Sequence, residues 1–274
     1  MNLLPCLHGT FTYYHDSWLP TLTELGITPT DPWTTIHPGI SVSRSKRVNC
    51  FLIEDNHKKS FYKTYQLHDK FWEFFFRPSK CLTEVRNYET MKKIGIPCPT
   101  VLAYGERRSF GSLHENFIVT DAITDAQDLS NFAEEWFLIK CSTEKNRIYQ
   151  ELSQKVLKQT KLAHRNNFFH FDLHWRNILI KKDLSGNWQS FWIDSPRGCK
   201  IKFDRRRGYL VDLSCLARFA VYYLTRTQRY RFICDYLDLP GGPKVKALFR
   251  AVDARLARRP PPIPRKIRER PKNS

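Results

Sequence analysis

The stretch FHFDLHWRNILI, residues 169–180, carries five side chains that can do chemistry inside an otherwise apolar run. They are His170, Asp172, His174, Arg176 and Asn177. Phosphoryl transfer from ATP needs a carboxylate that orients the acceptor hydroxyl, and an amide oxygen and a second carboxylate that hold a metal ion. A loop between two short strands can supply these groups. The pattern therefore predicts the catalytic loop of a phosphotransferase.

Within this loop, Asp172 is expected to face the acceptor hydroxyl, and Asn177 to turn back toward the metal ion. The strand-like SFWID, residues 190–194, ends in Asp194, which would be the other metal ligand. His170 is interpreted as a brace that hydrogen-bonds the loop backbone. A single histidine or aspartate near a strand end is more often a satisfied structural group, but the complete pattern HxDxxxxN, apolar strand, turn and apolar-apolar-Asp is specific.

A lysine that grips the phosphates is expected upstream, on a strand that follows a hairpin turn. Lys63 in FYKTY, residues 61–65, has this position and is enclosed by aromatic residues, as expected of a cation inserted in a cleft. The alternative is an ordinary edge-strand lysine. The next helix offers Glu84 and Glu89 as partners. Glu84 is preferred because its side of the helix adjoins Tyr88 on the predicted buried face.

The elements that position these residues follow from the apolar pattern. Residues 39–66 are predicted to be strands, interrupted by the polar turn EDNHKK. Residues 79–95 form the clearest helix, with Ser79 as its N-cap and Gly95 at its end. Further strands are predicted over VLAYGER and ENFIVTDAI, and helices over residues 130–165 and 209–236.

This order of strands, one helix, strands and a mostly helical half predicts an α+β fold with two lobes that join near residue 121. The expected divisions are a leader over residues 1–34, a small β-rich N-lobe for nucleotide binding over 35–120, a mainly helical catalytic C-lobe over 121–255, and a mobile, basic, Pro-rich tail over 256–274.

The composition is that of a globular protein, since 41% of the 274 residues are hydrophobic and 14% aromatic. The sequence shows no membrane span, no secretory signal and no CxxC among its eight cysteines. We therefore expect a cytoplasmic protein with reduced thiols. The net charge of +18 attracts nucleic acid, acidic lipids or phosphorylated substrates. Nucleic acid is not expected, because the basic residues are dispersed and no reader motif is present.

With these residues in place, the sequence resembles the lipopolysaccharide core kinases, the Kdo/heptose kinase family with a protein-kinase-like fold. The resemblance runs from about residue 40 to 240. It is carried by FYKTY, GIPCPTVLAYGER, HFDLHWRNILI, FWIDSPRG and RRGYLVDLSCLARF. It implies ATP-dependent phosphorylation of a Kdo or heptose hydroxyl in the inner core of lipopolysaccharide. The implied location is the cytoplasmic face of the inner membrane, with peripheral contact to anionic lipid.

The resemblance also implies residue roles. Asp172 would be the catalytic base, Asn177 and Asp194 the Mg²⁺ ligands, and Lys63 with Glu84 would hold the phosphates of ATP. Each role coincides with the one argued from the residue types above.

Three further places follow from the resemblance. FIVTDAI would be the hinge, in which the backbone of Asp121 and Ile123 meets adenine. Asp212 resembles the buried helix carboxylate that holds the catalytic loop, although a charge favoured by a helix N-terminus is an open alternative. His174 stands where serine/threonine protein kinases usually have lysine. Histidine there is more typical of sugar and small-molecule phosphotransferases.

Two departures from the protein-kinase pattern leave alternatives open. The stretch GISVSRSKRVN, residues 39–49, has Gly39 alone where a glycine-rich loop lets backbone amides approach the phosphates. Serines and basic residues such as Arg44 would replace those contacts. Asp194 is followed by Ser-Pro-Arg-Gly, which removes the usual activation-switch phenylalanine. The alternatives are a kinase of another small-molecule or protein hydroxyl, and a pseudokinase scaffold that binds anionic membrane.

The positive charge suits a lipid-linked, polyanionic acceptor. Each basic residue near an anionic surface adds about 1 kcal/mol of attraction. The aromatic-basic KFWEFFFR, residues 70–77, and the tail from residue 256 are candidates for membrane contact. Core packing of the aromatics and a solvated tail are the alternatives.

Overall fold

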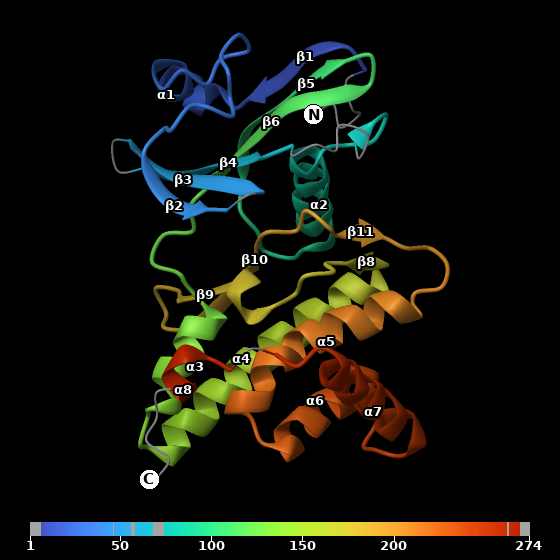
Figure 1. Ribbon diagram of the computed structural model, residues 1–274. Coiled ribbons are helices and arrows are strands. Elements are labelled where there is room, and N and C mark those ends of the chain that lie inside the picture. Colours follow the sequence, from blue (N-terminus) through green and yellow to red (C-terminus); the bar gives the residue numbers. More distant parts are fainter. Residues whose placement is uncertain (1–6, 46, 56–57, 68–73, 262, 269–274) are drawn as a thin grey trace. The chain divides into compact units, whose positions relative to one another are not determined.

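The computed structural model describes residues 7–45, 47–55, 58–67, 74–261 and 263–268 (Figure 1). The chain divides into two compact units. The first unit consists of Met1–Lys93, Cys98–Thr124 and Ser195–Arg197, and the second of Ile94–Pro97, Asp125–Asp194 and Gly198–Ser274. The first unit is rich in strands and the second is mainly helical, so the predicted α+β class is confirmed.

A six-stranded antiparallel sheet forms most of the first unit, in the order β1-β5-β6-β4-β3-β2 (Figure 1). Its strands are β1 (Gly9–Tyr14), β2 (Ile40–Arg44), β3 (Val48–Asp55), β4 (Lys58–Tyr65), β5 (Val101–Ser109) and β6 (Ser112–Asp121). The side chains of β4 alternate, so that Tyr62 and Thr64 are buried on one face while Lys63 points to the other.

The helix of the first unit that matters for the site is α2 (Lys80–Ile94). The Ser79 hydroxyl accepts a hydrogen bond from the backbone N–H of Leu82 at 3.0 Å, which is the predicted N-cap. Gly95, at φ 82°, follows the last helical residue as predicted. Because these two signals are local, the sequence places this helix to within a residue at each end.

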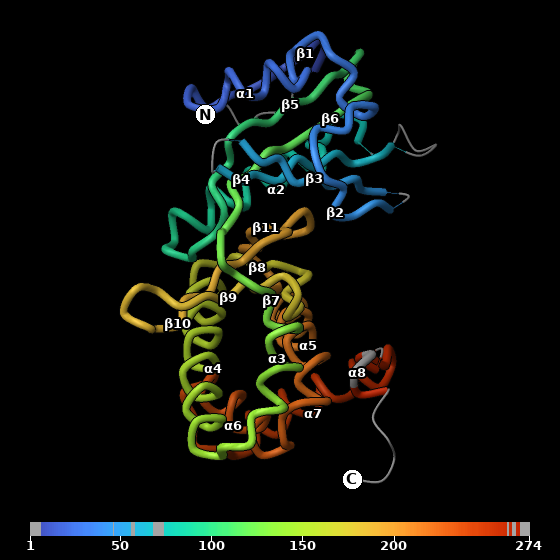
Figure 2. Tube along the Cα trace, turned by 90° about the vertical axis from the view of Figure 1, so that its left-hand side faces the viewer, coloured from blue at the N-terminus to red at the C-terminus, as the bar shows by residue number. Residues whose placement is uncertain are grey.

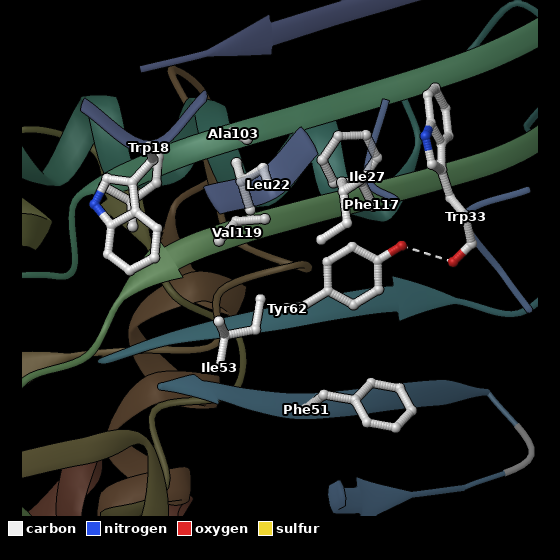
Figure 3. Packing of buried hydrophobic residues seen from close by; sticks show 11 residues of the cluster. Trp18, Leu22, Ile27, Trp33, Phe51, Ile53, Tyr62, Ala103, Phe117 and Val119 are labelled. Atoms are coloured by element: carbon white, nitrogen blue, oxygen red, sulfur yellow. Dashed lines mark hydrogen bonds between the residues drawn. The ribbon is translucent and has the colours of Figure 1, made fainter. Parts of the chain in front are cut away.

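The N-terminal residues differ from the predicted leader. Strand β1 pairs with β5 along its whole length. After it, η1 (Asp16–Trp18) and α1 (Leu19–Glu24) lead to a segment whose apolar side chains pack on the sheet. Trp18, Leu22 and Trp33 lie in one core with Phe117 of β6 (Figure 3). The hydroxyl of Tyr62 donates a hydrogen bond to the Trp33 carbonyl at 2.6 Å. The segment thus covers an apolar sheet face that would otherwise meet water.

The second unit has two small sheets and a group of helices. The sheets have the orders β10-β9-β7 and β11-β8. Figure 2 shows the helices gathered on one side of the β9–β10 hairpin. In chain order the elements are β7 (Gln127–Asp128), α3 (Leu129–Phe137), α4 (Ser142–Arg165), β8 (Phe168–Phe169), η3 (Trp175–Asn177), β9 (Ile178–Lys182), β10 (Trp188–Trp192), β11 (Cys199–Lys200), α5 (Arg206–Tyr223), α6 (Arg226–Leu237), α7 (Pro243–Arg258) and α8 (Arg265–Arg268).

The predicted tail begins inside helix α7, which the sequence analysis did not identify. Leu256 is buried with Phe249 in the core of the second unit. Beyond the helix, the carbonyl of Pro261 accepts a hydrogen bond from the hydroxyl of Tyr222 on α5 at 2.6 Å. The chain is therefore fixed to α5 at residue 261, and residues 269–274 of the predicted mobile tail lie outside the described residues. Within the described ranges, no helix is long and apolar enough to cross a membrane.

Candidate active site

The predicted phosphate-binding lysine has the predicted partner. Nζ of Lys63 on β4 lies 3.0 Å from Oε1 and 3.3 Å from Oε2 of Glu84 on α2. The side chain of Glu84 is only 1% exposed and that of Lys63 17%. A buried carboxylate needs compensation, and the ammonium group supplies it. The other candidate, Glu89, is half-buried further along α2.

Two tyrosine hydroxyls complete the surroundings of Glu84. The hydroxyl of Tyr65 donates to Oε2 at 2.8 Å, and the hydroxyl of Tyr88 donates to Oε1 at 2.9 Å. Together with Lys63, they give the carboxylate four hydrogen bonds, which is about its full capacity. The sequence analysis used Tyr88 only as a marker of burial. Its spacing of four residues from Glu84 on one helix is the signal that would have shown the contact.

A buried carboxylate on α5 holds the catalytic loop. Asp212 is 0% exposed and accepts hydrogen bonds from the backbone N–H groups of His170 and Phe171, each at 2.8 Å. Its Oδ2 also lies 3.2 Å from Nε2 of His164. Asp212 sits well inside α5 rather than at its first turn. The position of Asp212 therefore agrees with a carboxylate that holds the loop and disagrees with a charge at a helix N-terminus.

The loop and the strand that precedes Asp194 are tied together. Nε2 of the fully buried His170 lies 3.0 Å from the carbonyl oxygen of Ile193, and the N–H of Ile193 donates to the Asn177 carbonyl at 3.0 Å. Burial lowers the pKa of His170, although Asp212 acts in the opposite direction. The buried ring therefore joins the loop to the strand before Asp194, which is the contact expected of a brace.

Left-handed backbone occurs on both sides of this connection. Phe171 has φ 61° and Asp194 has φ 58°. Such conformations are unfavourable for residues other than glycine and persist where surrounding bonds over-determine them. The bonds from Asp212 and to Ile193 are of that kind.

Asp172 is kept ionised by its neighbours. Its side chain is 20% exposed, with Nε2 of His174 at 3.3 Å from Oδ1 and Nη2 of Arg176 at 3.6 Å from Oδ2. Partial burial acts to raise the pKa of Asp172, but the hydrogen bond and charge of His174 and the charge of Arg176 outweigh it. The pKa is lowered to about 2. At neutral pH this group is a hydrogen-bond acceptor beside His174 and the guanidinium group of Arg176.

Asn177 is oriented by Asp172. The amide nitrogen of Asn177 donates to the Asp172 carbonyl at 2.8 Å and approaches Asp172 Oδ2 at 3.3 Å. The opposite edge of the amide is therefore its oxygen. An amide oxygen and the Asp194 carboxylate are hard donors of the type that Mg²⁺ accepts. Among the described residues, no three His, Cys, Asp or Glu side chains could hold a metal by themselves. Mg²⁺ usually takes one or two protein ligands besides phosphates and water.

The predicted hinge lies at the end of β6. The N–H of Asp121 donates to the Thr100 carbonyl at 2.8 Å, and the next N–H, of Ala122, donates to the Lys59 carbonyl at 2.9 Å. A contact of the Asp121 backbone with adenine would therefore use its carbonyl oxygen. Ile123 follows, half-buried, just before the first unit ends at Thr124.

The predicted phosphate loop is the turn between β2 and β3. All five residues of β2 are exposed. Gly39 has φ 110°, and a Cβ there would collide with the Leu52 carbonyl oxygen, so this single glycine is required by the fold. The hydroxyl of Ser45 accepts hydrogen bonds from the N–H groups of Val48 at 3.0 Å and Arg47 at 3.2 Å. Lys46 of this loop lies outside the described residues. The Ser45 hydroxyl thus binds two backbone N–H groups of the kind that a glycine-rich loop would offer to phosphates.

The chain after Asp194 has an anchor that the sequence analysis missed. Nδ2 of Asn87 on α2 donates to the Ser195 carbonyl at 2.6 Å, and both residues are buried within the first unit. A phenylalanine is absent from this place, as noted from the sequence. An asparagine on the buried face of α2, three residues after Glu84, is the signal that could have been used.

Comparisons with known proteins agree with the resemblance seen in the sequence. The model of the lipopolysaccharide kinase (Kdo/WaaP) family matches residues 46–236. The lipopolysaccharide core heptose(I) kinase WaaP of Pseudomonas aeruginosa is 27% identical over 154 residues. The aligned stretch is 55% of this chain and 56% of that protein, so it spans about half the length of that relative.

Two solved structures are similar to this chain. The structure described as WaaP in complex with acyl carrier protein has a TM-score of 0.68 and 20% identity, and the match covers 90% of this chain and 97% of that one. The PknI kinase domain of Mycobacterium tuberculosis has a TM-score of 0.42 and 13% identity, over 78% of this chain and 94% of that one. The match to the WaaP structure confirms the predicted fold.

Proposed function

The chain belongs to the lipopolysaccharide kinase (Kdo/WaaP) family, and on this premise we propose that it transfers the γ-phosphoryl group of ATP to a hydroxyl of Kdo or heptose in the inner core of lipopolysaccharide. The observation that carries the proposal is the loop in which Asp212 and Asn177 fix an ionised Asp172. Buried bonds of this number around one exposed carboxylate favour a catalytic role over a structural one.

In this proposal the two units divide the work. The first unit binds the nucleotide: Lys63, fixed by Glu84, attracts the α- and β-phosphates, and the backbone at Asp121 and Ile123 meets adenine. The second unit supplies the catalytic loop and the metal ligands Asn177 and Asp194. When Mg²⁺ is bound, it neutralises charge on the phosphates. The ligand chemistry of the two side chains fits this ion, as argued above.

The chemistry assigned to the chain's own residues is positioning and charge stabilisation. Asp172 accepts a hydrogen bond from the sugar hydroxyl and so directs its oxygen at the γ-phosphorus. As the new oxygen–phosphorus bond forms, the bond to the leaving ADP oxygen breaks and the hydroxyl proton passes to Asp172. His174, beside Asp172, is placed to stabilise the charge of the transferred group. Its imidazole takes the place that lysine has in many protein kinases.

The acceptor and the location are parts of the same proposal. Heptose is the first acceptor to test, because the curated relative is named a heptose(I) kinase. A lipid-linked acceptor places the protein at the cytoplasmic face of the inner membrane as a peripheral protein. The net charge of +18 supports contact with anionic lipid, which adds about 1 kcal/mol per basic residue near the surface.

The test is phosphate transfer to lipopolysaccharide that lacks core phosphate, and to the soluble oligosaccharide released from it. With ATP and Mg²⁺, the wild type should add one phosphate to a core sugar, as detected by mass spectrometry. Asp172→Asn should lower turnover by about a thousandfold and leave ATP binding in place. Full activity of that variant would remove Asp172 from its role. ATP turnover without modification of the glycan would favour another hydroxyl acceptor, and absence of nucleotide binding would favour the pseudokinase scaffold.

A further inference from the structure

Four exposed apolar side chains form a patch in the first unit, apart from the residues assigned to catalysis. Phe75 and Phe76 pack edge to face with ring centroids 4.3 Å apart, and Phe110 lies 4.9 Å from the ring of His8. The aromatic patch, as we call it, consists of Leu7, Phe75, Phe76 and Phe110, whose exposed fractions are 59%, 37%, 60% and 80%.

Backbone bonds join the segments that present the aromatic patch. The N–H of Gly111, next to Phe110, donates to the Leu7 carbonyl at 2.7 Å. The N–H of Phe76 donates to the Gly111 carbonyl at 3.2 Å. One connected surface is thus formed by the N-terminal segment at Leu7, the segment before α2 at Phe76, and the β5–β6 turn.

The two most exposed phenylalanines of the aromatic patch have unfavourable backbone conformations. Phe110 has φ 47° and Gly111 φ 86°, at the two central positions of the hairpin between Ser109 and Ser112. Asn-Gly is the usual pair at such positions, because both need left-handed backbone. Phe76 has φ 52°. Each phenylalanine therefore carries the cost of exposure and of backbone strain, and the stability of the fold explains neither.

A buried arginine supports this surface from below. Arg108 is 1% exposed and its charge is paired with Glu106 at 3.0 Å. Its Nη1 donates to the carbonyls of Phe74 at 2.9 Å and Gly111 at 3.0 Å, and its Nη2 donates to the carbonyl of Arg77 at 2.6 Å. A buried guanidinium is expensive unless fully bonded. Here it fixes both segments that display the phenylalanines, so the aromatic patch has a rigid base.

We infer that the aromatic patch docks the protein on an anionic bilayer, with Phe76 and Phe110 inserted at the level of the lipid headgroups. This deepens the proposed function and rests on it, because a lipid-linked acceptor requires an enzyme that works at a bilayer. Aromatic side chains favour the interface between water and lipid. Phe110 lies in the β5–β6 turn and is 80% exposed, and Phe76 is 60% exposed. Apolar side chains exposed to this degree favour a deformable bilayer over a folded protein partner.

The charge around the aromatic patch complements such a surface. The segments that form it, residues 7–10, 74–80 and 107–114, contain no aspartate or glutamate. Of their four basic residues, Arg77 is exposed and Lys80 half-buried, whereas Arg107 and Arg108 are paired with Glu115 and Glu106, which lie just outside these segments. Membrane contact was predicted for residues 70–77, of which 70–73 lie outside the described residues. The inference adds the β5–β6 turn, which the sequence analysis did not single out.

The experiment measures partition of the full chain onto vesicles of phosphatidylethanolamine and phosphatidylglycerol, by co-sedimentation. In Phe76→Asn and Phe110→Asn, asparagine accepts the left-handed backbone better than phenylalanine. Thermal stability should therefore hold, while the partition coefficient falls about tenfold for each change. Phe203→Asn removes a phenylalanine that is 86% exposed elsewhere and should change nothing. High salt should weaken binding of all variants and preserve their order.

Wild-type partition by the double variant Phe76→Asn/Phe110→Asn would overturn the inference, and so would an equal loss in Phe203→Asn. Phosphorylation of the soluble core oligosaccharide separates this failure from failure of the proposed function. That reaction needs no bilayer, so the double variant should perform it at the wild-type rate. If the wild type does not phosphorylate the oligosaccharide yet needs both phenylalanines for vesicle binding, the kinase proposal fails and the docking surface stands.

Discussion

The two loops assigned to ATP and to the acceptor hydroxyl are built in opposite ways. The turn between β2 and β3 follows a strand whose five residues are all exposed, and one hydroxyl, of Ser45, closes it. The loop around Asp172 rests on buried groups of Asp212, His170 and Asn177. Buried hydrogen bonds thus determine the second loop, whereas exposed groups alone hold the first.

The ion pair of Lys63 and Glu84 is held by buried groups, as is the loop around Asp172. Two buried tyrosine hydroxyls hold Glu84, so its carboxylate has little freedom to leave the lysine. Asn87 on the same helix holds the Ser195 carbonyl. A helix fixed in this way suits an enzyme without an activation switch, which agrees with the missing phenylalanine after Asp194.

The largest effect is expected at the support of the catalytic loop. Asp212→Asn keeps the shape of the side chain, but an amide nitrogen then faces backbone N–H groups that a carboxylate oxygen had satisfied. The free energy of unfolding should fall by about 3 kcal/mol. The kcat should fall by about a hundredfold, because a displaced loop misplaces Asp172. Denaturant unfolding and steady-state kinetics measure the two effects.

A matched control exists in the second unit. Oδ1 of Asp183 accepts hydrogen bonds from the N–H groups of Ser185 and Asn187, each at 2.9 Å, in the exposed β9–β10 turn. Asp183→Asn should change neither quantity appreciably. If Asp212→Asn kept the wild-type kcat, the contrast between the two loops would lose its functional meaning.

A smaller effect is expected at the phosphate-binding lysine. Tyr88→Phe removes one donor to Glu84 and should lower the free energy of unfolding by about 1 kcal/mol. It should raise the KM for ATP about fivefold, which corresponds to the same free energy. Tyr65→Phe should act alike, and the double variant more strongly. Tyr62→Phe is the control, since its hydroxyl is also buried and bonded, to the Trp33 carbonyl. An equal rise in KM for Tyr62→Phe would show that general loosening of the first unit is the cause.

The smallest effect is expected in the exposed turn. Ser45→Gly releases the N–H groups of Val48 and Arg47 and leaves the buried structure untouched. The KM for ATP should change by less than about threefold, or about 0.6 kcal/mol, because exposed hydrogen bonds lie at the weak end of the range for such bonds. Titration with ATP, followed by kinetics, gives the value. A tenfold change would mean that Ser45 shapes the nucleotide site as firmly as Asp212 shapes the catalytic loop.

Local signals made much of the molecule predictable. The cap at Ser79, the stop at Gly95 and the spacing between Asp172 and Asn177 all act within a few residues. The pairing of Lys63 with Glu84 also followed, because a buried helix face limits the choice of partner. Except for Lys63 and Glu84, which are 21 residues apart, the residues that decide the outcome stand close together in the sequence.

Features that depend on distant partners were missed. Strand β1 was taken for part of a leader because its partner, β5, begins only at Val101. Helix α7 was not identified, and its last residues from 256 on were assigned to the basic tail, since its apolar side chains are needed only by the core that they complete. The anchor at Asn87 depends on Ser195, and no sequence pattern near either residue indicates the contact. Helix and strand propensities do not reveal such pairings, because the stabilising energy of these contacts comes from tertiary packing.

The route of the chain between the two units has a consequence for its synthesis. The chain passes from one unit to the other after residues 93, 97, 124, 194 and 197. The short segment Ser195–Arg197 belongs to the first unit but emerges from the ribosome only after the long helix α4 and the catalytic loop. The first unit therefore cannot be completed as an N-terminal fragment. In a chain of which only residues up to 124 have been synthesised, Asn87 on α2 would lack its hydrogen-bond acceptor, the carbonyl of Ser195.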